Sequence, residues 1–423
     1  MPSNKRIEGS AGWTLVAVAA LAHFFGLASI STHAFGVFVL PLQHQFGWTR
    51  GQIAFANTIM MVTLIVSAPI AGALADRFGT KPLVLGSTLF MGVALACMAY
   101  MATIDEFYLA YLLIGTLGVG TIGPIYVRLI FSWFKTKKGL ALGLVMGGGS
   151  ASAIILPPAL NALISAEGWR VAYGCLAACE ILVICPLILW GIRSYPASTQ
   201  EGHAQLAAAT GDQDVDGVSF GDALKSPIFY MLCMLFFVLA IGQSVYIHII
   251  PLVVDKGISP ATAALAASVL GVTTLIARLL TGLSLDYFRI RVVAIILLTF
   301  SALGMLVLMI SNSVPGVFLG AMLVGVIYGG EADVMGFFVI TYFGRRAYAR
   351  LHTTVFSAYV GGGAVGVMLT GSLFDRFHDY TIPLQIGVGC ALFAIVVIWT
   401  FDRSGKRELS NTRPVRLGQP EAA

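Results

Sequence analysis

The chain has 423 residues, of which 58% are hydrophobic and 11% are charged, and its formal net charge is +5. A soluble globular protein carries about a quarter charged residues, so this composition excludes a soluble domain and predicts a protein that crosses a membrane repeatedly. The six cysteines lie inside apolar runs, without a C-x-x-C pair or a His/Cys cluster, and predict neither a disulfide framework nor a metal site.

Twelve apolar runs of about 20 residues or more follow one another along the chain, bounded by charges, glycine, proline or aspartate. The only long polar segment lies between the sixth and seventh runs and is typical of a flexible linker. The sequence therefore predicts an all-α membrane protein with twelve transmembrane helices in two pseudo-symmetric six-helix bundles, 1–192 and 227–423, joined by a cytoplasmic linker at 193–226. The expected spans are 14–40, 51–75, 82–102, 107–132, 139–163, 171–191, 228–252, 262–285, 292–311, 316–342, 351–374 and 382–401.

Lysine and arginine are distributed unequally between the two sides of these spans. If the N-terminus is cytoplasmic, the tails and alternate loops on that side hold roughly 19 of these residues, and the opposite side holds roughly 4. The positive-inside rule then places both termini in the cytoplasm of a multi-pass protein of the cell (inner) membrane. The excess positive charge reflects topology in a lipid bilayer, and we expect no nucleic-acid partner.

The two predicted halves share a short repeated pattern. The segment GALADRFGTK (72–81), after the second span, is echoed by GLSLDYFRIR (282–291), after the eighth span. A weaker echo pairs the glycine triplets 147–149 and 361–363, which we interpret as close-packing or bending points. Two parallel repeats with a site near the midplane between them form a transporter architecture.

The segment GALADRFGTK resembles the loop signature of the major facilitator superfamily. Further segments, AFGVF (34–38) with FGWTRGQI (46–53), KGLALG (138–143) and GWR (168–170), resemble its monocarboxylate-porter branch. The resemblance implies the major facilitator fold and proton-coupled movement of small organic anions, with Arg278 of the eighth span engaging the carboxylate. It also implies that the repeated loops hold the cytoplasmic side shut, which assigns a gating role to Asp76, Arg77, Asp286 and Arg289.

Arg278 lies well inside the eighth span, where an uncompensated guanidinium costs about 3 kcal/mol or more. It can anchor a carboxylate, and because it cannot lose its proton it cannot be the proton carrier. The alternative is a structural ion pair with Asp333 or Glu331. Where animal members of the branch carry an aspartate one turn earlier, this chain has Thr274. The balancing charge must therefore come from another helix, from the substrate, or from both.

Other polar side chains inside the spans are candidates for the same substrate site. His33 and His248 lie in the first helices of the two halves, which are symmetry-related around the cavity in this architecture. Histidine changes charge near neutral pH, so we expect both to bind substrate and His248 to take part in proton coupling, with packing as the alternative. Gln243, Tyr126 and Tyr359 are expected to bind substrate by hydrogen bonds or as aromatic walls.

Glu331 and Asp333 lie mid-span in the tenth helix, where carboxylates are costly unless they are protonated or paired. They are about 200° apart on an ideal helix, so we expect one at most to face the cavity. Both are candidates for proton coupling: Glu331 as the proton site, and Asp333 as the partner of Arg278 or Arg128. A structural pair is the alternative, and for Arg128 and Glu180 the sequence leaves function and structure open.

The sequence also argues against several other mechanisms. The segment GVGTIG (118–123) matches G-x-G-x-x-G but lies inside a span without a preceding strand, so close packing of small residues explains it better than a nucleotide site. Without a Walker sequence or an H-E-x-x-H constellation, we expect no nucleotide, no cofactor and no enzyme activity.

The leading hypothesis is a secondary active transporter that works as a monomer and takes up a small monocarboxylate with a proton by alternating access. The alternatives are a porter for an aromatic acid, a dicarboxylate or another metabolite, and an exporter. A non-transporting membrane sensor is a further alternative, although the polar segments are too short to fold into an output domain.

Overall fold

The computed structural model describes residues 10–134, 137–192, 217–344 and 346–411. Among these residues, twelve helical segments are long and apolar enough to cross a membrane, as judged by length and composition. Their number and order agree with the prediction. The expected linker, 193–226, lies mostly outside the described residues, which resume at 217 before the short helix α11 (Phe220–Ala223).

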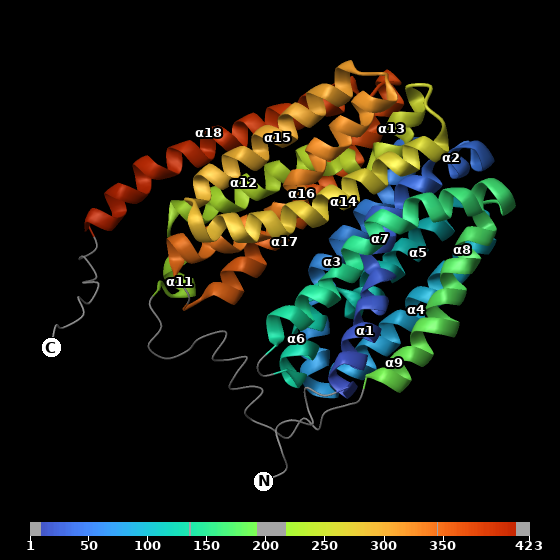
Figure 1. Ribbon diagram of the computed structural model, residues 1–423, viewed down its shortest axis with the longest axis horizontal. Helices are drawn as coiled ribbons and strands as arrows, with labels where there is room; N and C mark the ends of the chain where they lie inside the picture. Colours follow the sequence, from blue (N-terminus) through green and yellow to red (C-terminus); the bar gives the residue numbers. More distant parts are fainter. Residues whose placement is uncertain (1–9, 135–136, 193–216, 345, 412–423) are drawn as a thin grey trace, which may run out of the picture.

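The first six spans form the blue-to-green bundle of Figure 1 (the N bundle), and the last six form the yellow-green-to-red bundle (the C bundle). The N bundle consists of α1 (Ser10–Phe24), η2 (Ser29–Ala34) and α2 (Phe35–Phe46); α3 (Arg50–Phe78); α4 (Thr80–Tyr100); α5 (Ile104–Leu117), η3 (Gly118–Thr121) and α6 (Gly123–Trp133); α7 (Lys138–Glu167); and α8 (Trp169–Ala178), η4 (Cys179–Ile184) and α9 (Cys185–Gly191). The C bundle consists of α12 (Pro227–Gln243), η5 (Ser244–His248) and α13 (Ile249–Asp255); α14 (Pro260–Tyr287); α15 (Ile290–Ile310); α16 (Val314–Phe343); α17 (Tyr348–Phe377); and α18 (Thr381–Asn411).

The ends of these helices follow local signals in the sequence. Thr49 opens α3 with a capping box in which the Gln52 side chain returns to the Thr49 main chain, and Thr103 opens α5 in the same way. Gly79 and Gly168, both with φ of 88°, make the turns from α3 to α4 and from α7 to α8, because glycine adopts this conformation without strain. Such short turns place consecutive helices antiparallel.

The first span is longer than the sequence predicts, because it continues to Phe46 instead of ending at residue 40. Gln43, His44 and Gln45 prolong the helix beyond its apolar run. A helix satisfies its own backbone groups, so it does not have to stop where the hydrocarbon core of the membrane ends. The apolar run therefore marks the part of the helix that can lie in the hydrocarbon core of the membrane, and the helix itself continues beyond this run.

Irregular segments interrupt several spans. The segments η2 and η4 are π-helical, whereas η3 and η5 are 3₁₀-helical. Segment η3 is the glycine-rich sequence that matches a nucleotide fingerprint, and a Cβ on Gly120 would lie 2.5 Å from Ser87 Oγ. Close packing therefore accounts for these glycines. π-helical turns are rare and occur frequently at functional sites, which draws attention to His33 in η2 and Glu180 in η4.

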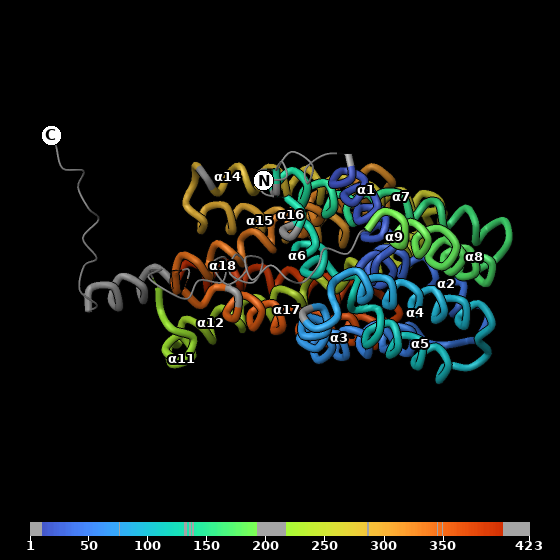
Figure 2. Tube along the Cα trace, turned by 90° about the horizontal axis from the view of Figure 1, so that it is seen from below, coloured from blue at the N-terminus to red at the C-terminus, as the bar shows by residue number. Residues whose placement is uncertain are grey.

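Most contacts between the bundles come from two helix pairs: α3 lies beside α17, and α7 lies beside α14 (Figures 1 and 2). On α3, the Gly51 main-chain nitrogen donates to Asp375 Oδ2 at 2.7 Å, and Thr58 Oγ1 donates to the Ala364 carbonyl at 2.8 Å. In the second pair, Ser268 Oγ of α14 donates to the main-chain carbonyl oxygen of residue 154 in α7 at 2.6 Å. These contacts lie in the half of the molecule that holds the end of α13 and the start of α18. We call the side of the molecule at these two helix ends the latch face.

The contacts between the bundles stop toward the opposite side, called the terminal face, where α1 and α12 begin. On α3, the residues that contact the C bundle recur at helical spacing, and Gly72 continues the same stripe. A Cβ on Gly72 would meet no atom of the described residues within 4 Å, and the same holds for Gly282 on the stripe of α14 and Gly147 on that of α7. The bundles therefore touch near the latch face and separate toward the terminal face.

Candidate functional site

Helices α14 and α16 cross at a stripe of glycines, and this crossing positions Arg278. A Cβ on Gly329 would lie 2.4 Å from the Thr274 carbonyl oxygen and 2.7 Å from the Arg278 main-chain nitrogen. Gly325 and Gly330 also meet α14 at short range. Only small residues let the backbones of two membrane helices approach each other this closely. The glycines of α16 therefore hold the acidic segment that follows them against the turn of α14 that carries Arg278.

Arg278 lies on the stripe of α14 that faces the N bundle. Ser268 and Gly271 on this stripe contact α7. A Cβ on Gly282, further along the stripe, would meet no atom of the described residues within 4 Å. Arg278 lies between Gly271 and Gly282 on this stripe. The side chain is half-buried, and within the described part of the chain it makes no hydrogen bond and no ion pair. A guanidinium has five N–H donors in a planar fork. At Arg278 this fork is free to bind a ligand at the level where the bundles begin to separate.

Three titratable side chains interact electrostatically with Arg278: Glu331 and Asp333 of α16, and His23 of α1. His23 belongs to the N bundle, so Arg278 and His23 face each other across the two bundles. Neither carboxylate comes within ion-pair distance of Arg278, as far as the described residues show. The structural ion pair that the sequence allows is therefore not formed in this conformation.

Glu331 is held by a cluster of polar groups inside the C bundle. Tyr359 Oη of α17 lies 2.6 Å from Glu331 Oε1 and 3.2 Å from Gln243 Oε1 of α12. The Tyr328 hydroxyl donates to the main-chain carbonyl of Gln243. The Gln243 side chain approaches Glu331, but among the described residues neither Gln243 Nε2 nor the second carboxyl oxygen, Glu331 Oε2, forms a hydrogen bond of good geometry. The structure thus brings together three of the predicted residues, Glu331, Gln243 and Tyr359.

The N bundle contributes a second hydrogen-bonded group, centred on Ser152 of α7. His33 Nδ1 and Ser29 Oγ both lie 2.8 Å from Ser152 Oγ, which is also 2.7 Å from the Gly149 carbonyl. His33 is half-buried in the π-helical segment η2. Ser152 could not be identified from the sequence, because a serine in a long apolar helix shows no pattern that distinguishes a residue with several hydrogen bonds from a packing residue.

Tyr126 lies in the interior of the N bundle and is 0% exposed. Its ring packs edge-on against His23, with the ring centroids 5.3 Å apart. Its hydroxyl has no hydrogen-bond partner among the described residues. In this conformation Tyr126 is therefore covered by its neighbours, whereas His23, which the sequence analysis did not select, lies toward Arg278.

A network on the latch face joins the bundles through Arg50 at the start of α3. Its guanidinium forms an ion pair with Asp255 at the end of α13, and Nη1 lies 3.0 Å from the Tyr380 hydroxyl. Its main-chain nitrogen donates to Asp375 Oδ1 at 2.9 Å, and the guanidinium carbon lies 3.7 Å from the Phe374 ring centroid. We call Arg50, Asp255, Asp375 and Tyr380 the latch.

The latch could not be predicted from the sequence, because its residues are far apart in the chain. Asp255 and Asp375 are separated from Arg50 by 205 and 325 residues. A charge at a helix end next to an apolar run is ordinarily solvated, so nothing local distinguishes these residues. The one available signal was the position of Arg50 inside the segment FGWTRGQI, which the resemblance had already singled out.

His248 lies behind the latch and not in the gap beside Arg278. It is 0% exposed, its ring centroid is 6.0 Å from that of Tyr380, and it interacts electrostatically with Arg50. The Val367 main-chain carbonyl approaches the ring without reaching hydrogen-bond geometry, so neither ring nitrogen has a hydrogen-bond partner in the part of the chain that the structure describes. The two predicted histidines are thus placed differently: His33 lies in the interior of the N bundle, and His248 lies under the latch.

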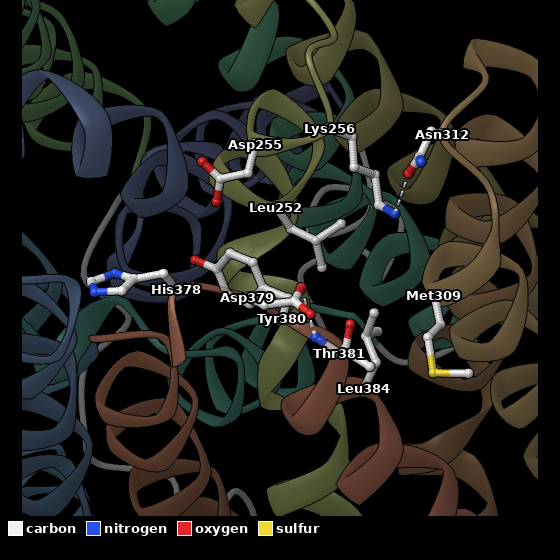
Figure 3. Close-up of a pocket in the computed structure, with 10 residues that line it drawn as sticks. All are labelled: Leu252, Asp255, Lys256, Met309, Asn312, His378, Asp379, Tyr380, Thr381 and Leu384. Carbon is white, nitrogen blue, oxygen red and sulfur yellow. Dashed lines mark hydrogen bonds between the residues drawn. The ribbon is translucent and has the colours of Figure 1, made fainter. Parts of the chain in front are cut away.

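A pocket of about 360 Å³ opens beside the latch, within the C bundle. Figure 3 shows Lys256 reaching Asn312 on one side of this pocket, with Asp255 and Tyr380 on the other; the Lys256 Nζ to Asn312 Oδ1 distance is 3.1 Å. Burial lowers the pKa of Lys256, and the nearby Asp379 opposes this shift. Acidic side chains, Asp255 and Asp379, and the basic side chain of Lys256 all line the pocket. Because both signs of charge are present, the pocket does not favour an anion.

The predicted gating residues lie at the turns of the terminal face. Arg77 and Arg289 are exposed there, and the side chains of Asp76 and Asp286 lie outside what the structure describes. Arg128, near the same face, donates from Nη1 to the Gly72 carbonyl at 3.5 Å. This contact links the end of α6 to the helix that carries the repeated loop. The roles proposed for these residues stay predictions.

The chain matches the sequence profile of the Major Facilitator Superfamily over residues 17–257 and 232–419, and it belongs to this family. Its solved structural neighbours share the fold at low sequence identity. A bacterial homolog of the human lysosomal transporter Spinster, in an inward-facing and unoccupied conformation, is 15% identical with a TM-score of 0.70, covering 98% of this chain and 100% of that one. A D-xylose–proton symporter is 14% identical with a TM-score of 0.73, covering 92% of this chain and 97% of that one.

Relatives in sequence are also transporters. An uncharacterized MFS-type transporter of Bacillus subtilis (strain 168), YcxA, is 25% identical over 370 residues, which is 85% of this chain and 88% of the relative. Human monocarboxylate transporter 11 is 24% identical over 398 residues, which is 88% of this chain and 79% of the relative. The protein is thus a multi-pass membrane transporter of this superfamily and not an enzyme.

Proposed function

We propose that this protein takes up a small monocarboxylate together with a proton, by alternating access in a monomer. The observation that carries the proposal is the position of Arg278. Its guanidinium has no protein partner among the described residues and faces the N bundle where the contacts between the bundles end. A cation placed inside a membrane protein without a partner favours an anionic ligand, and the planar fork of arginine matches a carboxylate.

The names of relatives support this class of substrate. Human monocarboxylate transporter 11 aligns with most of the chain, and mouse monocarboxylate transporter 2 aligns with 44% of it at 25% identity. The identities are low, so the relatives support a class of substrate and leave the individual acid to experiment.

The proton in this proposal is carried by Glu331. Tyr359 has one hydroxyl proton and two oxygen neighbours, Glu331 Oε1 and Gln243 Oε1. All three oxygens are satisfied when Glu331 is protonated and donates to Tyr359, which then donates to Gln243. Glu331 also lines a void of about 20 Å³ that is otherwise apolar, where a carboxylate would have no solvation. A substrate anion on Arg278 would lie near this proton, because Arg278 and Glu331 interact electrostatically.

The remaining parts of the proposal concern orientation and gating. We assign the terminal face to the cytoplasm of a cell membrane, because most lysines and arginines gather there. The conformation described here is then open to the cytoplasm, with the latch closing the outside. Asp76, Arg77, Asp286 and Arg289 would close the cytoplasmic side in the opposite conformation. The N bundle would comprise 1–192 and the C bundle 227–423, with 193–226 as the linker between them.

Uptake of a panel of labelled carboxylates into proteoliposomes tests the proposal, with and without an inward proton gradient. We expect a monocarboxylate to accumulate with the gradient, and Arg278→Ala to lose at least about 90% of this uptake, since the loss of a charge-assisted pair costs about 1.5 to 3 kcal/mol. Arg350→Ala, at an exposed position at the start of α17, is the matched control and should transport normally. If no carboxylate accumulates, or if Arg278→Ala matches the wild type, the proposal is wrong.

A further inference from the structure

The N bundle contains a carboxyl group that the proposed function does not use. Glu180 lies in the π-helical segment η4 and is 1% exposed. Both of its carboxyl oxygens are buried without a hydrogen-bond partner, within the described residues. A buried polar group without a partner is uncommon in a native structure, and a buried carboxyl group is more uncommon still.

The surroundings of Glu180 make room for this side chain and leave other polar atoms unpaired. A Cβ on Gly92 of α4 would lie 3.1 Å from Glu180 Cβ, so the glycine is what admits the carboxyl-bearing turn. Thr88 lies one turn earlier on the same face of α4, and its buried hydroxyl has no hydrogen-bond partner among the residues that the structure describes. The Tyr126 hydroxyl is also unpartnered, and Tyr126 interacts electrostatically with Glu180. Glu180, Thr88 and Tyr126 lie on three neighbouring helices, and their polar atoms share one apolar region inside the N bundle.

No positive charge balances this carboxyl group. The titratable groups that interact electrostatically with Glu180 are Tyr126 of α6 and the thiols of Cys179 and Cys185 in its own span. Within the described residues, no lysine, arginine or histidine acts on it. An isolated carboxylate in such an interior would cost far more than a protonated carboxyl group. Glu180 therefore holds a proton in this conformation.

A line of polar residues connects Glu180 to the gap between the bundles. His23 interacts electrostatically with Arg278, and its ring contacts that of Tyr126 at 5.3 Å between centroids. The Thr121 main chain approaches the His23 ring, but His23 Nδ1 forms no hydrogen bond of good geometry among the described residues, and neither does the Tyr126 hydroxyl that follows it. The order along this line is Arg278, His23, Tyr126 and Glu180. Water molecules or side-chain rearrangements that joined these groups would give a hydrogen-bonded path for a proton.

We propose that Glu180 is a second proton-binding site of the transport cycle, in the N bundle, loaded and unloaded through His23 and Tyr126. The proposal rests on the proposed proton-coupled function and deepens it. The proton adds to one carboxylate oxygen of Glu180 and leaves from the same oxygen, and no other bond changes. If Glu331 and Glu180 each carry one proton, a monoanion moves with two protons and the cycle transfers one net positive charge. Removing the Glu180 site lowers the charge moved per anion by one.

Two measurements on the full-length protein in liposomes test the assignment. The first is infrared difference spectroscopy between acidic and alkaline pH without substrate. We expect protonated carboxyl bands that disappear as the pH rises in the wild type; Glu180→Gln should lack one of them and keep the one that belongs to Glu331. The matched control is Glu167→Gln, at the exposed end of α7, which should keep both bands. If the band that is lost in Glu180→Gln does not change with pH in the wild type, Glu180 is a permanently neutral packing group and the proposal is wrong.

The second measurement is the charge moved per labelled anion, from transport currents and uptake in the same liposomes. We expect Glu180→Gln to exchange substrate at equilibrium within about twofold of the wild type, and to move one charge less per anion. An unchanged charge ratio overturns the proposal, as does accumulation that follows a sodium gradient in place of the proton gradient. If the wild type transports no carboxylate, the proposed function fails, whereas the infrared measurement still decides whether Glu180 exchanges a proton.

Discussion

Arg50 and Asp255 join the two bundles through paired charge-assisted hydrogen bonds, with Arg50 Nη2 at 2.8 Å from Asp255 Oδ1. The Arg50 side chain is 4% exposed and the Asp255 side chain is 33% exposed. A pair with one buried member is held more firmly than a surface pair, which contributes about 0 to 1 kcal/mol. Any motion that opens the latch face must break this pair, so it sets part of the free-energy difference between the two transport conformations.

Asp255→Asn should therefore shift the protein toward the conformation that is open at the latch face. Losing the charged partner of Arg50 costs about 1 to 3 kcal/mol, after allowing for the partial exposure of Asp255. This corresponds to about a 5- to 150-fold change in the population ratio. Spin labels at Asp105→Cys and Val314→Cys, on exposed positions of the N and C bundles at this face, would report the change as longer distances.

The control for the latch experiment is Asp379→Asn, an exposed carboxyl in the same region that does not contact Arg50. It should leave the distance distribution unchanged. A distance distribution of Asp255→Asn that matches the wild type would show that the pair does not hold the latch face closed.

The fold could be predicted from the sequence because membrane helices carry a strong one-dimensional signal. Runs of about 20 apolar residues give the spans, and the repeat at 72–81 and 282–291 indicates the two bundles. The end of the first span at Phe46 could not be predicted in this way, since its last turn is polar. The π-helical segments η2 and η4 could not be predicted either, because their composition does not differ from that of the α-helices around them.

The candidate site could be predicted only in part. Arg278, Glu331, Gln243 and Tyr359 were found as polar residues that have to be accounted for inside apolar spans, and the structure places them in one region of the C bundle. The latch could not be found by this reasoning, because its residues lie at helix ends, where charge is ordinary. Which polar groups come into contact depends on how helices from distant parts of the chain cross. In the sequence, the glycines at these crossings indicate a close helix contact but not which helix makes it.

The central glycine of each triplet tests the pseudo-symmetry of the bundles. A Cβ on Gly148 would lie 2.1 Å from the Ala20 carbonyl oxygen, and a Cβ on Gly362 would lie 2.1 Å from the Phe237 carbonyl oxygen. Each triplet thus packs its middle residue against the first helix of its own bundle. We expect Gly148→Ala and Gly362→Ala each to destabilise the protein by about 1 to 3 kcal/mol, because a backbone must move to make room. Thermal unfolding in detergent would measure the loss.

Gly147→Ala is the control within the same triplet. A Cβ on Gly147 meets no atom within 4 Å, so the substitution brings no clash. Alanine favours a helix over glycine by up to about 1 kcal/mol, and the melting temperature should therefore stay the same or rise. Equal melting temperatures for Gly147→Ala and Gly148→Ala would contradict the close packing described for the triplet.

Ser152 should be a structural hub of the N bundle. Ser152→Ala removes the common partner of His33 Nδ1 and Ser29 Oγ. Ser29 Oγ keeps its hydrogen bond to the His23 carbonyl, whereas the half-buried His33 Nδ1 loses its partner. An unpaired polar group of this kind costs about 1 kcal/mol, so the melting temperature should fall. The control is Ser165→Ala on the same helix, where the side chain is exposed and the effect should stay within about 0.5 kcal/mol. A similar melting temperature for the two variants would mean that the hydrogen bonds of Ser152 do not contribute to stability.

Tyr359→Phe separates proton coupling from substrate binding. The substitution removes the hydroxyl that lies 2.6 Å from Glu331 Oε1 and keeps the aromatic ring. If Glu331 carries the proton, the loss of this hydrogen bond should reduce gradient-driven uptake by about 10- to 150-fold, which corresponds to about 1.5 to 3 kcal/mol. Exchange of labelled for unlabelled substrate at equal pH should fall much less, because the Arg278 guanidinium is unchanged.

The matched control for Tyr359→Phe is Tyr230→Phe, at an exposed position of α12 in the same bundle. It should leave both gradient-driven uptake and exchange at wild-type values. A group that is needed only for proton transfer is not required when substrate exchanges without net proton flow. If Tyr359→Phe loses exchange and uptake equally, its hydroxyl therefore takes part in substrate binding. Wild-type uptake in Tyr359→Phe would remove the cluster around Glu331 from the proton step.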